Sequence, residues 1–227
     1  MLSPRFSRRI RRWMAWAGIL VLTGSLGTPA LAQSDPPAAA DHLSAGEILR
    51  PLALHATVQD GEIVGFEQIH RIFMSVNQRR LMFMLPQQYR VELKHPEKIT
   101  LANADFTALL AVRVLTAAEG ASAPGSSAGY RAWITSRWPD LILLNEGTFS
   151  AAKSSGPAFE FSCKVDDVAR KVQIGFVPTP VGILEFSAVC SPETFASAKS
   201  TLYVLMRSFQ ISDPDGKLNI VAVRGDN

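Results

Sequence analysis

Apolar and polar residues largely alternate over three neighbouring segments in the last third of the chain. The segments are residues 158–165, 171–177 and 181–190, and almost every second side chain in them is apolar. Short turn sequences separate them, Asp166-Asp167 after the first and residues 178–180 after the second. A period of two residues is typical of a β-strand with one buried face. The sequence therefore predicts a three-stranded antiparallel meander with one apolar face.

A helix is predicted directly after this meander, over residues 193–209. Ser191 is suited to cap it, and Pro192 to occupy its first position, where a missing N–H costs nothing. The apolar residues recur at helical spacing and form one stripe: Phe195, Ala198, Leu202, Leu205, Met206 and Phe209. The stripe needs an apolar partner, and the meander is the nearest one. The sequence therefore predicts an α+β domain in which helices cover an antiparallel sheet.

Shorter elements are expected in the middle of the chain. Residues 69–76 and 79–85 are rich in β-branched and aromatic side chains and flank Asn77-Gln78, which predicts a hairpin. Residues 108–116 are apolar almost throughout and predict a strand buried on both faces. A short helical turn interrupted by Pro51 is expected within 47–55. The remaining expected elements are strands at 89–93 and 98–102 and a helix at 130–138.

The first 32 residues have the three parts of a secretory signal peptide. Five arginines come first: Arg5, Arg8, Arg9, Arg11 and Arg12. An apolar run begins at Trp13, and Ala30-Leu31-Ala32 supplies the small residues that signal peptidase requires. We expect cleavage after Ala32, because the apolar run has about 14 residues and a bilayer span needs roughly 20. The alternatives are an uncleaved anchor and, given Arg8-Arg9, export by the twin-arginine route.

Removal of this segment changes the charge of the chain. The full sequence has 23 basic and 20 acidic residues. Loss of five arginines leaves 18 basic residues, a net charge of about −2, which argues against a nucleic-acid partner. We expect a flexible leader at 33–62, one domain at 63–212 and a C-terminal extension at 213–227. No transmembrane span is expected after the signal peptide, so the protein is expected in the bacterial periplasm or outside the cell.

Residues 181–210 resemble the C-terminal part of PsbP-like domains, the family of the photosystem II extrinsic protein and of the periplasmic protein DcrB. The shared pattern is an apolar strand, a short turn, an amphipathic helix with Phe195, and Ser208-Phe209 at its end. Residues 82–93 resemble an early strand of the family, with Tyr89 where Trp is common. The resemblance implies an α/β/α sandwich. It also implies an accessory role through protein contacts and no catalysis.

Cys163 and Cys190 are candidates for a disulfide, because exported proteins mature in an oxidising compartment. The expected meander places them on its first and third strands, roughly 9.6 Å apart. A disulfide needs Cα atoms within about 7 Å. Both side chains are expected on the apolar face, where a free cysteine acts as a small hydrophobic residue. A bridge and two free thiols are therefore both open alternatives.

No catalytic or metal-binding pattern is found in the sequence. None of the four histidines has a second histidine or cysteine at metal-ligand spacing: His42, His55, His70 and His95. Residues 213–217 begin like a calcium loop but lack its later ligands. The sequence has no G-x-S-x-G motif and no Gly-rich phosphate loop. We therefore expect no metal and no cofactor.

Three aromatic residues of the helix at 130–138 form a candidate partner surface: Tyr130, Trp133 and Trp138. Core packing is the first explanation for them; the alternative is an exposed anchor for a partner, since Trp and Tyr are common in protein interfaces. The leading hypothesis is an exported, non-catalytic accessory domain that binds a protein partner or stabilises an envelope assembly. The second is a carrier of a small apolar ligand between helix and sheet, which a cavity bordered by Met82, Met84 and Met206 would favour. The third is an unrecognised hydrolase.

Overall fold

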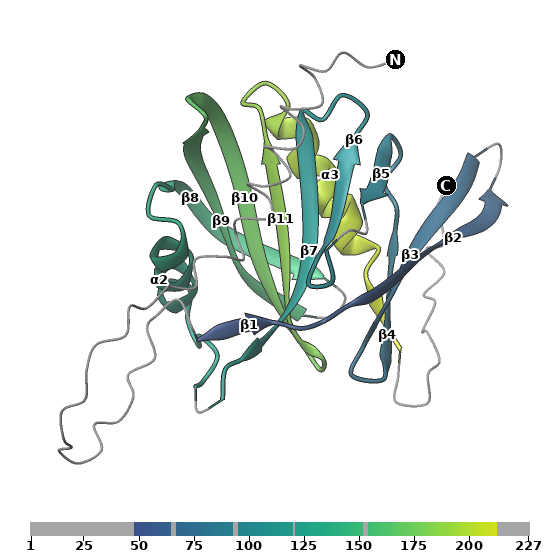
Figure 1. The fold of residues 1–227 in the computed structure, drawn as a ribbon, viewed down its shortest axis with the longest axis horizontal. Helices are drawn as coiled ribbons and strands as arrows, with labels where there is room; N and C mark the ends of the chain where they lie inside the picture. Colours follow the sequence, from purple (N-terminus) through teal and green to yellow (C-terminus); the bar gives the residue numbers. More distant parts are fainter. Residues whose placement is uncertain (1–47, 65–66, 93–94, 120, 152–153, 213–227) are drawn as a thin grey trace, which may run out of the picture. The chain divides into compact units, whose positions relative to one another are not determined.

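The computed structural model describes residues 48–64, 67–92, 95–119, 121–151 and 154–212. They form a large and a small antiparallel β-sheet and two helices, which confirms the α+β class (Figure 1). The expected signal peptide, the first part of the leader and the C-terminal extension lie outside the described residues.

The large sheet contains the predicted meander at its centre. Seven strands lie side by side in the order β5-β6-β7-β11-β10-β9-β8, and β1 pairs with the C-terminal end of β7. All neighbours are antiparallel. The strands are β1 (Leu49–Pro51), β5 (Tyr89–Glu92), β6 (Ile99–Asn103), β7 (Ala108–Ala117), β8 (Ile142–Ala151), β9 (Ser154–Val165), β10 (Val168–Thr179) and β11 (Gly182–Cys190).

The small sheet has the order β12-β4-β3-β2. Its hairpin between β3 and β4 is the one that the sequence predicts. Asn77 and Gln78 both have positive φ, 48° and 65°, and such turns match the right-handed twist of paired strands. The strands are β2 (His55–Val64), β3 (Glu67–Val76), β4 (Arg79–Met84) and β12 (Gln210–Ile211).

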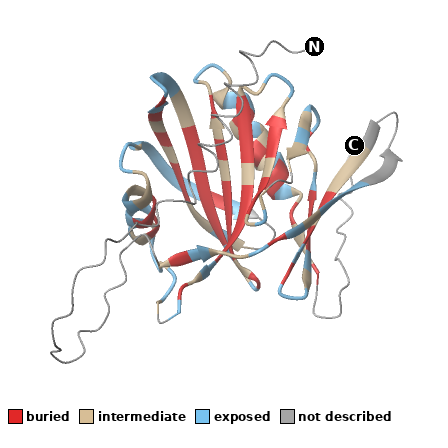
Figure 2. Ribbon diagram, viewed as in Figure 1, coloured by how far each residue is buried: buried red, intermediate tan, exposed pale blue. Residues whose placement is uncertain are grey.

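The pairing register assigns side chains to the two faces of the large sheet. Arg113, Glu185 and Phe176 are direct neighbours on β7, β11 and β10 and define one face, called here the α2 face. Val112 and Phe186 lie one position along and define the opposite, α3 face. All five side chains are buried. Figure 2 shows buried residues along much of the central strands β7, β10 and β11. The expectation of one apolar face is therefore wrong.

The cause of this difference is the register of β11. Its Leu184 and Phe186 point to the α3 face, whereas Phe159 of β9 and Ile174 of β10 point to the α2 face. Alternation within each strand was enough to predict the strands. It could not show which sets of side chains share a face, because a shift of one residue moves every side chain to the other side.

Helix α3 (Phe195–Arg207) and the small sheet share one core with the α3 face. Leu202, Leu205 and Met206 are fully buried there. Phe83 of β4 packs edge-on against Phe186, with ring centroids 5.9 Å apart. The apolar stripe predicted for this helix therefore does cover the sheet.

Helix α2 (Ser127–Arg137) packs on the opposite face. Tyr130 stacks on Phe176 with centroids 4.6 Å apart, and Trp133 meets the same ring edge-on at 5.7 Å. Ser126 caps the helix, since its Oγ accepts a hydrogen bond from the Gly129 N–H. The large sheet thus carries a helix on each face, as expected for an α/β/α arrangement.

Three local expectations are wrong. The helical turn expected at 47–55 is replaced by strand β1, because Leu49 pairs with Ala117 of β7. Strands β1 and β2 also place folded structure inside the expected leader at 33–62. Helix α3 begins at Phe195 and not at Pro192, because the Ser191 Oγ accepts from the Thr194 N–H and closes a separate turn.

A substitution of Gly175 on β10 tests how tightly side chains pack on the α3 face. A Cβ at this position meets the Phe149 ring at 1.7 Å. We expect Gly175→Ala to lower the free energy of unfolding by about 2–3 kcal/mol, because the ring must move within a packed core. Urea denaturation measures it. Gly147→Ala on β8 is the control, since nothing lies within 4 Å of its Cβ, and equal losses in both variants would contradict the expectation.

Candidate functional site

Strand β8 forms an edge of the large sheet and exposes three consecutive apolar side chains. Ile142 is 65% exposed, Leu143 36% and Leu144 46%. Among the described strands, β8 pairs with β9 only. Its outer edge therefore offers backbone N–H and C=O groups beside apolar side chains, and such an edge is a template for a further strand.

The opposite edge of the same sheet is protected in ways that β8 is not. Strand β5 has four residues and includes Arg90 and Glu92, and short, charged edges discourage pairing. Residues 142–145 carry no charge. An irregularity between Leu143 and Asn145 leaves Leu144 without a partner on β9, and bulges of this kind redirect side chains. The first half of β8 is therefore the least protected edge in the large sheet.

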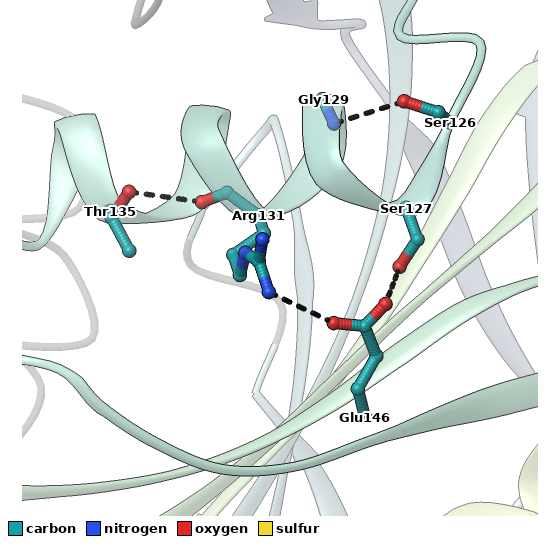
Figure 3. Close-up of polar contacts among 6 residues, drawn as sticks. All are labelled: Ser126, Ser127, Gly129, Arg131, Thr135 and Glu146. Carbon is teal, nitrogen blue, oxygen red and sulfur yellow. Dashed lines mark hydrogen bonds and ion pairs between the residues drawn. The ribbon is translucent and has the colours of Figure 1, made fainter.

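Polar contacts tie helix α2 to strand β8. Glu146 of β8 accepts a hydrogen bond from the Ser127 hydroxyl and pairs with the Arg131 guanidinium at 3.4 Å (Figure 3). Arg131 and Glu146 are 46% and 38% exposed, so the pair adds little to stability. Its structural effect is to hold the start of α2 beside the free edge.

The expected aromatic partner surface is wrong for two of its three residues. Tyr130 and Trp133 are 4% and 1% exposed, because both rings pack on Phe176. Burial also raises the pKa of Tyr130 above its ordinary value. Trp138 is half-buried, at the end of the helix, and its ring meets Trp133 edge-on at 6.0 Å. Tyr130 and Trp133 therefore belong to the core, as the alternative explanation predicted.

Cys163 and Cys190 are both buried free thiols. Cys163 pairs in register with Arg170 and Cys190 with Lys171. Since Arg170 and Lys171 are consecutive on one strand, the two thiols point to opposite faces of the sheet. The expected separation by two strands is confirmed, and the expectation that both lie on one face is wrong. A bridge between them is therefore excluded in this fold.

A row of charged residues is buried on the α2 face, which the sequence did not lead us to expect. Arg113 Nη2 lies 3.1 Å from Glu185 Oε1, and the side chains are 4% and 1% exposed. Lys98 is 6% exposed. It directly precedes Ile99, whose partner on β7 is Val112, so Lys98 lies beside Arg113. Alternation in 181–190 predicted Glu185 on a polar outer face, and only the pairing with β7 reveals its partner.

Burial and charge together lower the pKa of Lys98. The value falls from 10.5 to about 8, first because burial disfavours the ammonium and then because Arg113 repels it. Glu185 and Glu97 act in the opposite direction. Arg113, Glu185 and Glu97 also act on Arg137 at the end of α2. Burial lowers the pKa of Arg137. Lys98, Arg113, Glu185, Glu97 and Arg137 therefore form one electrostatic group.

The histidines and methionines that the sequence suggested as site residues do not form a common site. His55, His70 and His95 lie in the described part of the chain, where no group of three metal-ligating side chains is found, and His42 lies outside it. Met206 belongs to the core with Leu81 and Phe83, whereas Met82 and Met84 alternate with them on β4. The three methionines therefore do not border one ligand cavity, and this expectation is wrong.

Comparison with known proteins gives matches in structure only. No family model and no curated protein matches the sequence. LpqN of Mycobacterium tuberculosis, described as involved in cell envelope biogenesis, is 12% identical with a TM-score of 0.46; the match covers 70% of this chain and 92% of LpqN. Cyanobacterial PsbP of Synechocystis is 11% identical with a TM-score of 0.42, over 78% of this chain and 98% of that one. The second is from the family that residues 181–210 resemble.

The pKa of Lys98 predicts a pH-dependent effect of Lys98→Met. Below about pH 8 the lysine is charged in the folded and unfolded chain, so the folded state bears the full cost of burying it. We expect the variant to gain about 1–3 kcal/mol at pH 7. The gain should shrink as the pH rises from 8 toward 10.5, where both states become neutral. Urea denaturation across this range measures it, and a pH-independent gain would contradict the expectation.

The two thiols should be unreactive in the folded protein. Burial raises the pKa of Cys190 to about 11 and also raises that of Cys163. Near pH 8 the thiolate fraction of Cys190 is thus lower by about two orders of magnitude than that of a free thiol. We expect an aromatic disulfide reagent to titrate two thiols only after denaturation. If no thiol is titrated even after denaturation without reductant, the two cysteines form the bridge, and the expectation is contradicted.

Proposed function

We propose that the mature chain is an exported accessory domain, without a catalytic role of its own, that binds a protein of the bacterial cell envelope. The observation that carries this proposal is the edge strand β8. Its outer edge has no strand partner among the described residues, Ile142 and Leu144 are exposed, and residues 142–145 are uncharged. Binding adds an extended segment of the partner to this edge.

Strand addition explains why apolar residues are exposed on both sides of β8. Ile142 pairs with Ser162 and Leu143 with Phe161, so they point to opposite faces. A strand laid against β8 contacts both of them with alternate side chains, while backbone hydrogen bonds supply register and affinity. The Arg131–Glu146 pair lies further along and gives the interface a polar rim.

The place of action follows from the signal peptide expected at residues 1–32. Within the part of the chain that the structure describes, no helix is long and apolar enough to cross a membrane. The proposal therefore places the domain in the periplasm or outside the cell, and its partner on the same side of the inner membrane.

Charges on β8 should abolish partner binding. In Ile142→Lys/Leu144→Lys, two lysines replace apolar contacts that a partner strand buries, so we expect the amount of captured partner to fall at least about tenfold. The measurement is quantitative capture from a cell-envelope extract by tagged mature protein. Val168→Lys/Val204→Lys is the matched control, because these residues are each 49% exposed and belong to β10 and α3, not to the edge strand.

Three results decide the test. Loss of one stoichiometric partner in the β8 variant and its retention in the control support strand addition. Equal capture by both variants overturns it. A dimer of the wild-type protein in light scattering, lost in the β8 variant, shows that the edge binds a second copy and overturns the envelope partner.

A further inference from the structure

Strand β12 leaves one edge of the small sheet open. It pairs with β4 at Gln210 and Ile211, and with no other strand among those described. Directly after it, the Ser212 N–H donates to the Arg80 carbonyl of β4. Successive residues of a strand turn their backbone groups to opposite sides, so Ile211 directs its N–H and C=O to the open edge. An edge of this kind accepts a further strand.

A buried polar atom at this edge has no partner. Gln210 Oε1 is buried and accepts no hydrogen bond among the described residues. The residues on either side of it, Phe209 and Ile211, contribute to the core shared with the large sheet. The edge therefore presents apolar side chains on one face and an unsatisfied acceptor on the other. A strand that fits it has apolar residues that alternate with a hydrogen-bond donor.

The sequence directly after β12 meets both requirements. Residues 213–216 read Asp-Pro-Asp-Gly, and a type I turn favours Asp first, Pro second and Gly fourth. Residues 217–223 follow as Lys-Leu-Asn-Ile-Val-Ala-Val, with three β-branched residues and no charge after the lysine. This composition favours a strand. The sequence thus supplies a turn and a strand candidate at the point where β12 ends.

We propose that residues 217–223 occupy this edge as a fifth strand of the small sheet, antiparallel to β12. Two contacts with Arg80 fix the point where the chain leaves β12, because the Ser212 N–H donates to its carbonyl and the Ser212 Oγ accepts from its N–H. Only the four residues of the turn separate the two strands, so the entropy lost on closing the loop is small. The inference does not depend on the function proposed for β8.

Side-chain chemistry determines the register of this pairing. A four-residue loop built on a type I turn places Lys217 opposite Ser212. Asn219 then lies opposite Gln210, where its amide N–H donates to the unsatisfied oxygen, and Ile220 joins the core face. A shift of one residue would place Ile220 beside that oxygen and turn Asn219 toward the core. The register with Asn219 opposite Gln210 is therefore the one that satisfies both faces.

Hydrogen exchange at the Ile211 amide tests the strand in the mature protein. In the proposed register this N–H donates to residue 218, so Leu218→Pro should make it exchange at least about tenfold faster. Val221→Pro is the matched control, because the N–H of residue 221 points away from β12. The Ser212 amide donates to β4 and reports whether β12 stays in place. Equal exchange at Ile211 in the wild type and Leu218→Pro overturns the proposal.

A disulfide trap tests the register. Gln210 and Asn219 form a non-hydrogen-bonded pair in the proposed strand, and the Cβ atoms of such a pair lie at disulfide distance. Gln210→Cys/Asn219→Cys should therefore form a bridge within one chain on mild oxidation. Gln210→Cys/Ile220→Cys is the control, because its second cysteine points to the other face. The native thiols are buried, and mass spectrometry without reductant identifies the bridged peptides.

The location of the bridge decides the result. A bridge within one chain in the 210/219 variant, and none in the 210/220 variant, supports the proposal. A bridge between two chains assigns the edge to a second copy and overturns it. A bridge in the 210/220 variant, or none in either, also overturns it. Because Leu218→Pro leaves β8 unchanged, capture of an envelope partner by this variant separates failure here from failure of the function proposed for β8.

Discussion

The ion pair between Arg113 and Glu185 is the interaction on which the large sheet depends. Both residues lie on central strands whose two faces are buried, so neither can reach water. Their direct register makes the pair possible at 3.1 Å. A buried pair adds little net stability compared with apolar residues, but removal of one partner leaves an uncompensated charge. The pair therefore specifies how β7 and β11 align, since a slip of one residue would separate the two charges.

Helix α2 connects the exposed edge strand β8 with the buried charged row of the large sheet. Its N-terminal half holds Arg131, which pairs with Glu146 on the exposed strand β8. Its last turn holds Arg137, whose guanidinium lies 5.1 Å from the Trp133 ring and senses the charges of Arg113 and Glu185. The aromatic residues between these ends anchor the helix on Phe176. The helix is thus a structural support for both of these parts.

Patterning within the sequence predicted individual strands and the covering helix because these depend on local periodicity. The hairpin at Asn77-Gln78 and the three-stranded meander followed from such signals. Strand β8 escaped prediction because Ile142, Leu143 and Leu144 are consecutive apolar residues at an exposed edge, without the alternation of a half-buried strand. Glu185 lies on the face opposite Leu184 and Phe186, as expected, but that face is buried. Its partner, Arg113, lies 72 positions earlier, and no local pattern contains that pairing. The β8 edge and the buried charged row are therefore both invisible to periodicity, although a charged residue inside the apolar run 108–116 was a signal.

The order of strands also determines when the domain can fold. The central neighbours β7 and β11 are separated in the chain by α2 and the three strands β8, β9 and β10, and α3, which closes the core, is later still. Pairings of such long sequence separation form slowly, because loop closure precedes any gain from burial. A chain emerging from the ribosome has no closed core until nearly all of it has been made.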